Sequence, residues 1–139
     1  QVIHQVLMGE PEPGELHAGT TSNVAALVLQ PTITVPAAVT AASKQIAVGF
    51  TPPVGKTQRV TLFLYEFNAP EGRPARGHSF PAPKANGITG PAAETGSITF
   101  AFDGVAAGDY LAYVQVDGAE SLLGLDGAGK FATPKVKIT

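Results

Sequence analysis

The sequence has no cysteine, so it can form no disulfide bond, no cysteine-ligated zinc site and no thiol nucleophile. It has no tryptophan either, and only 14% of its 139 residues are charged. Its longest apolar run is far shorter than the roughly 20 residues that a membrane-spanning helix needs. We therefore expect a domain that is stabilised by packing alone and has no membrane span.

Charge of either sign is also scarce. The 9 basic and 11 acidic residues leave a net charge of -2, and the lysines and arginines form no stripe along the chain. A protein that binds nucleic acid gains most of its affinity by neutralising phosphates with such a stripe. Nucleic acid is therefore not an expected partner.

Residues that could carry chemistry are few and scattered. His4, His17 and His78 lack the paired spacing of a metal site, and each is interpreted as a solvated residue. Ser79 follows His78 directly, but neighbours along a strand point to opposite faces, so the two do not make a hydrolytic pair. We expect no catalytic site, no cofactor and no enzymatic activity.

Four aspartates, Asp103, Asp109, Asp117 and Asp126, each stand beside a glycine. A calcium site between the loops that hold Asp117, Glu120 and Asp126 is conceivable, because hard cations bind clustered oxygens. The spacing matches no EF-hand loop, however, and Asp-Gly is a common turn dipeptide. The preferred interpretation is that these aspartates form turns, so that no metal site is predicted.

What the chain does have is alternation of apolar and polar residues, with 44% hydrophobic residues, 16 glycines and 12 prolines. The clearest strand begins at Asp109 and ends at a turn made by Asp117 and Gly118. One face of it carries Tyr110, Ala112, Val114 and Val116. A tyrosine at the start of such a strand is typical of immunoglobulin-like sandwiches, where its hydroxyl bonds back to the preceding corner; simple core packing is the other explanation.

Further strands are predicted where alternation recurs between proline- and glycine-rich segments, at residues 24–29 continuing past a break to Ile33 and Val35, 43–50, 58–68, 97–102 and 136–138. Pro31 and Pro36 indicate an edge position for the first, and Pro52-Pro53 is expected to end the second. Residues 69–97 are predicted to be a long exposed loop with a short edge strand at 77–80, and residues 122–130 a second loop.

The segment 58–68 is apolar on both faces. Val60, Leu62 and Leu64 lie on one face and Phe63, Tyr65 and Phe67 on the other. Such a strand is usually central in a sheet, and its second face is covered either by the same chain or by a partner. Phe63, Tyr65 and Phe67 are therefore candidate interface residues.

Together these patterns predict an all-β fold, an immunoglobulin-like antiparallel two-sheet sandwich of about seven strands, with a closed barrel as the alternative. Residues 24–139 are assigned to the sandwich. Residues 1–23 are assigned to an N-terminal arm and linker from an upstream domain, because an apolar stretch ending at Met8 precedes a tract rich in proline and glycine. The apolar stretch either ends a strand of that domain or pairs with a neighbour.

Three segments resemble the C-terminal immunoglobulin-like domain of tail cap (terminator) proteins from phage-tail-like contractile injection systems. They are Pro52-Pro53-Val54 with Gln58–Leu64, Ala107–Leu111 running through Val114–Ser121, and Pro134–Ile138. The resemblance covers about Gln30 to Thr139, and the Val-Asp-Gly-Ala-Glu-Ser run is its most specific part. The chain departs from the family at Lys56-Thr57, where a glycine is expected before the Gln-Arg pair, and it lacks the N-terminal capping domain.

The resemblance implies a non-catalytic structural module that decorates or braces the ring closing the inner tube and sheath. Its partners would be those tail proteins and further copies of itself in a symmetric ring, in a particle that assembles in the bacterial cytoplasm and can be released. It carries over only structural positions: Asp109 and Tyr110 at the corner, Asp117 and Gly118 at the turn, and Glu120 and Ser121 just beyond. The alternative is a secreted or surface domain that binds a glycan or receptor through its loops.

Overall fold

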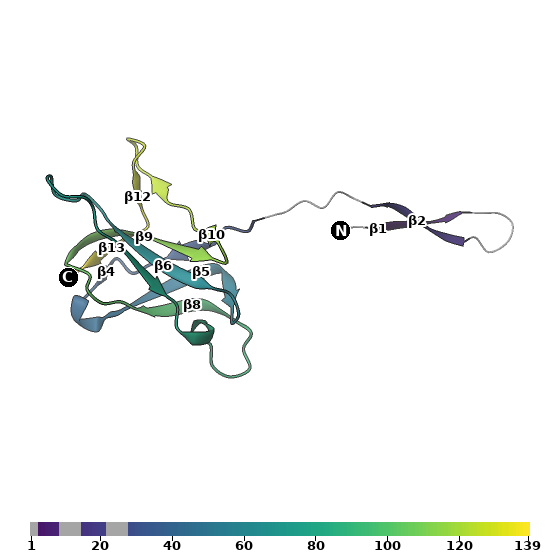
Figure 1. The fold of residues 1–139 in the computed structure, drawn as a ribbon, viewed down its shortest axis with the longest axis horizontal. Coiled ribbons are helices and arrows are strands. Elements are labelled where there is room, and N and C mark those ends of the chain that lie inside the picture. Colours follow the sequence, from purple (N-terminus) through teal and green to yellow (C-terminus); the bar gives the residue numbers. More distant parts are fainter. Residues whose placement is uncertain (1–2, 9–14, 22–27) are drawn as a thin grey trace.

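The computed structural model describes residues 3–8, 15–21 and 28–139, with side chains in the last range only (Figure 1). β1 (Ile3–Met8) and β2 (Glu15–Thr21) pair antiparallel and join no other described strand. The tract assigned to a linker therefore contains a strand, and the boundary between arm and domain stays a prediction. Of the strand expected at 24–29, residues 24–27 lie outside the described residues, and Val28 and Leu29 belong to no strand.

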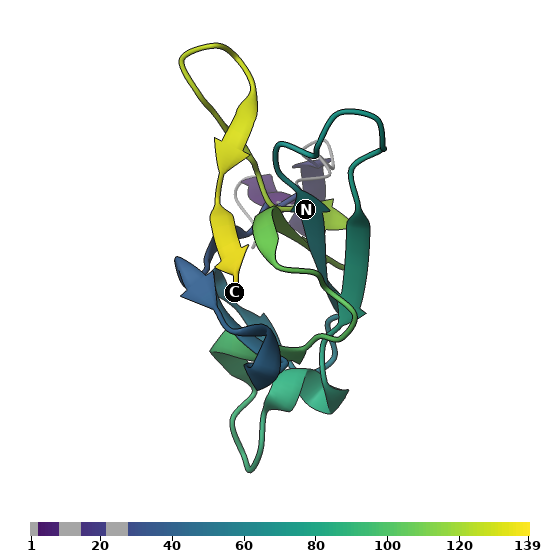
Figure 2. The same ribbon diagram turned by 90° about the vertical axis from the view of Figure 1, so that its left-hand side faces the viewer.

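Residues 28–139 form two sheets that pack face to face (Figure 2). The smaller sheet has the order β3 (Thr32–Thr34), β5 (Gln45–Gly55) and β8 (Glu94–Ala101). The larger has the order β4 (Ala38–Val39), β13 (Lys135–Ile138), β9 (Gly108–Val116), β6 (Val60–Glu66) and β7 (Gly77–Pro81), and β10 (Ala119–Glu120) pairs with β9. The remaining elements are the hairpin of β11 (Gly124–Leu125) with β12 (Phe131–Thr133) and two 3-10 turns, η1 (Ala41–Ser43) and η2 (Lys84–Gly87).

This arrangement confirms the all-β, immunoglobulin-like sandwich. Strands adjacent in sequence cross between the sheets, since β5 is followed by β6 and β8 by β9 in the other sheet. All described pairs are antiparallel except β4 with β13. The barrel alternative is wrong, because no hydrogen-bonded strand pair joins the two sheets in the described part of the chain.

The core lies between the sheets and follows the predicted alternation. On β9, Tyr110, Ala112 and Val114 are 0% exposed, and Val114 faces the core as predicted. On β6, Val60, Leu62 and Leu64 are buried against them, and β6 is central between β9 and β7. The smaller sheet contributes the residues that the alternation of 43–50 and 97–102 assigned to one face, namely Ile46, Val48, Phe50, Ile98, Phe100 and Phe102.

The corner before β9 is tied by Tyr110. Its hydroxyl donates a hydrogen bond of 2.9 Å to the carbonyl of Ala106, four residues upstream. This is the bond expected of a tyrosine corner, and Asp109 lies beside it at the start of the strand. Burial raises the pKa of the Tyr110 hydroxyl.

Replacing Tyr110 by Phe is expected to lower the free energy of unfolding by about 1 kcal/mol, since only the hydroxyl and its hydrogen bond are lost. Urea denaturation measures the difference. Tyr65→Phe is the matched control. It removes the same hydroxyl from a side chain that is 50% exposed and lies outside the core, so the free energy of unfolding should not change. Equal stability of Tyr110→Phe and the unmodified chain would contradict a stabilising role for the corner bond.

The turn after β9 is also as predicted. Asp117 (φ 49°) and Gly118 (φ 93°) make the two-residue connection to β10, a backbone conformation that glycine and aspartate adopt readily. Asp117 is further fixed to the start of β6, because its Oδ1 accepts a hydrogen bond of 2.8 Å from the Arg59 N–H and its own N–H donates to the Arg59 carbonyl. The turn thus joins β9 to its neighbour β6.

Three loop predictions are wrong. β5 does not end at Pro52-Pro53 but continues to Gly55, because the prolines lie where its register with β8 shifts between Gly49 and Val54. The stretch 69–97 contains the predicted edge strand β7, but also η2 and the start of β8. The stretch 122–130 is not a plain loop, because it contains β11 and leads into β12.

Candidate functional site

The outer face of the larger sheet carries a row of aromatic and apolar side chains. Register places Phe63 beside Tyr113 and Tyr65 beside Leu111 on neighbouring strands β6 and β9. The rings of Phe63 and Tyr113 stack, with centroids 4.8 Å apart and planes 7° from parallel. Lys135 pairs with Leu111 on the other side of β9.

A groove of about 500 Å³ opens on this face. Its lining consists of Gln30, Tyr65, Leu111, Tyr113, Glu120, Ser121, Leu122, Leu123 and Phe131. Leu111 is only 6% exposed although it lies on the outward side of β9, whereas Leu122 is 70% and Phe131 55% exposed. The lining of the groove is therefore mostly apolar. Glu120 is the charged residue among the side chains that line it.

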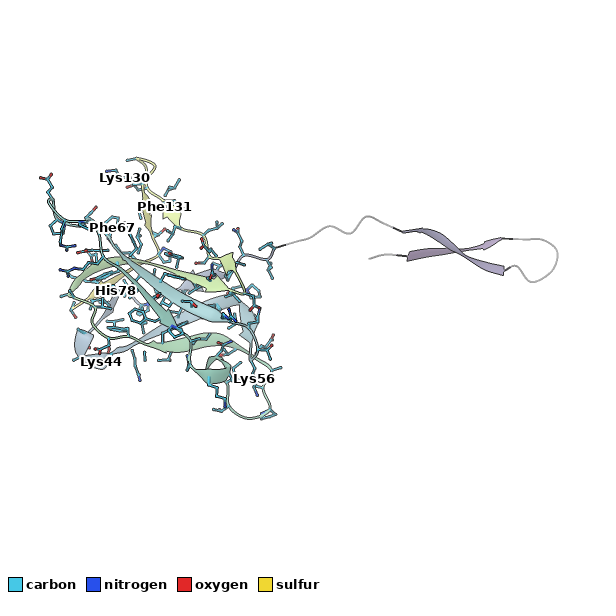
Figure 3. The ribbon with its side chains drawn as sticks, viewed as in Figure 1. Lys44, Lys56, Phe67, His78, Lys130 and Phe131 are labelled. Atoms are coloured by element: carbon cyan, nitrogen blue, oxygen red, sulfur yellow. The ribbon has the colours of Figure 1, made fainter. Side chains whose placement is uncertain are left out.

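The hairpin β11–β12 forms one side of the groove. Figures 1 and 2 show this hairpin and the loop between β6 and β7 extending beyond the sheets in the same direction. Figure 3 places Phe131 and Lys130 on the hairpin. Asp126 holds the hairpin tip together, since its Oδ1 accepts hydrogen bonds from the N–H groups of Ala128 (2.8 Å) and Lys130 (2.9 Å), which lower the pKa of the Asp126 carboxyl.

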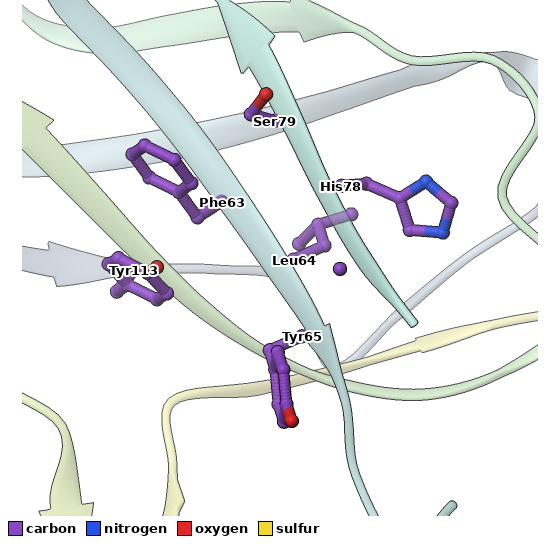
Figure 4. Close-up of a pocket in the computed structure, with 7 residues that line it drawn as sticks. Phe63, Leu64, Tyr65, His78, Ser79 and Tyr113 are labelled. Carbon is purple, nitrogen blue, oxygen red and sulfur yellow. The ribbon is translucent and has the colours of Figure 1, made fainter. Parts of the chain in front are cut away.

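A smaller hollow of about 230 Å³ adjoins the groove and shares Tyr65 and Tyr113 with it (Figure 4). Phe63, Leu64, Gly77, His78 and Ser79 complete its lining. Figure 4 shows the side chains of His78 and Ser79 pointing away from each other. They do not form a nucleophile and base pair, in agreement with the sequence interpretation.

Of the three predicted interface residues, the structure brings Phe63 and Tyr65 together beside the groove and its adjoining hollow. Phe67 lies apart, where the Lys135 Nζ stands 4.8 Å from its ring centroid and partly covers it. The sequence interpretation treated Tyr113 as packing and missed Leu111, Leu122 and Phe131. The signal for Leu111 and Tyr113 was present in the outward positions of β9, but nothing local marks Leu122 and Phe131.

The prediction that His78 is solvated is wrong. Its Nε2 is buried and has no hydrogen-bond partner among the described residues. The ring lies 6.2 Å from that of Phe80 in a nearly parallel orientation and meets the edge of Tyr110 at 6.0 Å. The physical reason is the register of β7, which pairs His78 with the inward-facing Leu64. His4 and His17 carry no described side chain.

The carboxylates weighed as calcium ligands have other roles. Asp117 and Asp126 accept backbone hydrogen bonds in their turns, and Glu120 stands at the groove rim. Among the side chains that the structure describes, no three histidines or acidic residues gather as a metal site would require.

The pKa of the Tyr113 hydroxyl, in the lining of the groove, is raised by burial and by the charge of Glu120.

One ion pair fixes the long loop between β6 and β7. The Arg73 guanidinium donates two hydrogen bonds, of 2.5 and 2.6 Å, to the Glu66 carboxylate, and the Arg76 N–H donates a third of 3.0 Å. These contacts lower the pKa of Glu66 from 4.5 to about 2, with the bond from Arg73 the largest cause.

Acid is therefore expected to loosen this loop. Because the folded pKa lies below the unfolded value, the Glu66 contribution is complete above pH 4.5 and is lost as the pH falls towards about 2. The difference in unfolding free energy between the unmodified chain and Glu66→Gln should be constant above pH 4.5 and should shrink as the pH falls from 4.5 to about 2. Glu71→Gln, in the same loop, is the control, and a difference that stays constant down to pH 2 would contradict the assignment.

The fold and the groove define the chain as an immunoglobulin-like sandwich domain with an open apolar groove on its larger sheet. The family described as a domain of unknown function, DUF8756, matches residues 31–139, and the chain belongs to that family. Neither curated proteins nor solved structures give a significant match. Within the described residues, no helix is long and apolar enough to cross a membrane.

Proposed function

We propose that this domain is a non-catalytic structural module that docks onto a protein partner through the groove. One observation carries the proposal. Six large apolar side chains of the described residues are exposed, and four of them belong to the groove or to the hairpin beside it: Tyr65, Leu122, Leu125 and Phe131. Exposed apolar side chains that gather in one place are typical of a protein interaction site.

The polar residues support a structural role. Those that sequence patterns single out make contacts within the fold: Tyr110 with the corner, Asp117 with Arg59, and Asp126 with its hairpin. Ser121, buried beside the groove, accepts a hydrogen bond from the Val114 N–H and donates its own N–H to the Val114 carbonyl. Of these contacts, that of Ser121 lies at the groove and that of Asp126 in the hairpin beside it, where they fix the backbone that a partner would meet.

The resemblance of residues 30–139 to tail cap proteins suggests the setting. We place the domain in the cap of a contractile injection particle, attached to the ring that closes tube and sheath. Rings of this kind contain several copies of each subunit, so one groove per copy would give a repeated set of identical contacts.

The proposal is tested on assembled particles that carry Leu122→Asp in this domain. Leu122 is 70% exposed, so the substitution leaves the core intact while placing a charge at the groove. Negative-stain images should show altered tail ends. Thr99→Asp, which adds the same charge on the exposed side of β8 in the other sheet, should leave them unchanged. Normal, fully functional particles with Leu122→Asp would argue strongly against docking through the groove.

A secreted or surface domain that binds glycans is the alternative outcome. Tyr65, Tyr113 and Phe131 give the groove aromatic surfaces on which a ligand other than a protein could lie. A glycan array that retains one family of sugars, with retention lost in Leu122→Asp and kept in Thr99→Asp, would replace the structural role by carbohydrate recognition.

A further inference from the structure

We infer that the occupant of the groove is the apolar strand β1 (Ile3–Met8) of a second copy of this chain. The inference depends on the proposed function, since it names the partner of the same docking site. It follows from the position of the groove, from the composition of β1 and from the incomplete sheet to which β1 belongs.

The apolar surface continues from the groove towards the arm. Gln30 lines the groove and also a neighbouring hollow of about 280 Å³, which shares Leu122 with the groove. Pro31 lines that hollow and a further one of about 310 Å³, which is bordered by Val28 and Leu29. Val28 and Leu29 are 69% and 66% exposed and are the remaining two of the six exposed apolar side chains. The segment that leads to the arm is thus part of the same surface.

The composition of β1 suits this surface. Its sequence contains Ile3, Val6, Leu7 and Met8 and no lysine, arginine, aspartate or glutamate. A charged strand would meet an unfavourable environment in a groove whose lining is mostly leucine and aromatic side chains. An apolar strand that binds there would bury the exposed side chains of the groove.

The sheet that contains β1 is incomplete. β1 pairs only with β2, and a two-stranded hairpin on its own is marginally stable in water. In the described part of the chain, neither strand pairs with a strand of the sandwich, so the edges of this two-stranded sheet are open to pairing with a further strand. Exchange of an identical element between copies is a low-cost route to association, and it propagates naturally around a symmetric ring.

The absence of cysteine gives a direct test with the 139-residue chain. One sample carries Leu7→Cys and a second carries Leu122→Cys. The two are mixed, oxidised mildly, and analysed by non-reducing electrophoresis and mass spectrometry. A disulfide between the two kinds of chain can form only between copies. It is expected in several-fold higher yield than with Thr99→Cys, whose cysteine is exposed on the other sheet.

Light scattering on the same chain provides a second readout. The unmodified chain should gain mass with concentration, whereas Leu122→Asp should remain a monomer and Thr99→Asp should behave like the unmodified chain. A separate chain carrying both Leu7→Cys and Leu122→Cys shows whether the link also forms within one copy.

Three results would overturn the inference. A link formed only within the doubly substituted monomer means that the arm covers its own groove. A link between two Leu122→Cys chains above the Thr99→Cys background means that two grooves meet face to face. No link above background means that the arm is not the occupant. If the particle experiment with Leu122→Asp still alters the tail ends, the groove remains a docking site and only its occupant was wrongly named.

Discussion

Val114→Asp is expected to unfold the domain. Val114 is 0% exposed in the second half of β9, and its side chain packs between the two sheets. A carboxylate at that position would be buried in the apolar core and costs several kcal/mol, on the order of the 5–15 kcal/mol that stabilises a typical domain. Circular dichroism and urea denaturation would show loss of the folded state at neutral pH.

Two comparisons make this result specific. Thr99→Asp adds the same charge at an exposed position of β8 and should melt like the unmodified chain. Val114→Ala removes only methyl groups and should cost less, about 1–3 kcal/mol, while leaving the protein folded. A soluble Val114→Asp with an unchanged melting temperature would show that the inward orientation of Val114 is wrong.

The second large effect is expected at Asn86, which is 4% exposed and lies in η2. Its side-chain amide donates hydrogen bonds to the carbonyls of Gly55 (2.7 Å) and Gln58 (3.0 Å), and thereby holds the turn between β5 and β6. Its backbone is left-handed, with φ of 54°, a conformation that costs alanine more than asparagine, although the neighbouring Ala85 also adopts it with φ of 52°. Asn86→Ala should lower the unfolding free energy by about 2–4 kcal/mol, through the loss of both hydrogen bonds in a buried site and through backbone strain.

Asn86→Gly separates these two causes. Glycine removes the amide but adopts a positive φ without strain, so it should recover roughly 1 kcal/mol relative to Asn86→Ala. Hydrogen exchange should show faster opening at Gly55 and Gln58 in both variants. If urea denaturation finds both variants as stable as the unmodified chain, the amide does not hold the turn.

The strands could be predicted because burial on one side of a sheet leaves a period of two in the sequence. Tyr110, Val114 and Val116 showed this period, and the Asp117-Gly118 turn was marked by its own residue types. Asn86 left no such trace. Its hydrogen-bond partners lie 28 and 31 residues away in the sequence. The residues next to Asn86 therefore carry no pattern that indicates its burial, and the segment reads as an exposed loop.

The groove was predictable only in part, for the same reason. Phe63 and Tyr65 stood out because they make the second face of β6 apolar. Leu122 and Phe131 are separated by the tip of a hairpin, and only the pairing of β11 with β12 brings them to the side of Tyr113. Their exposure depends on tertiary structure, and isolated apolar residues in a loop carry no pattern that announces it.

The parallel pairing of β4 with β13 has a mechanical consequence. The Lys137 N–H bonds to the carbonyl of Ala37, the Thr139 N–H to that of Val39, and the Ala41 N–H to that of Thr139. Tension applied between the segment before β4 and the end of β13 would pull two strands of the same direction past each other. These bonds would then bear the load together in shear, which would resist stretching better than bonds that open one after another.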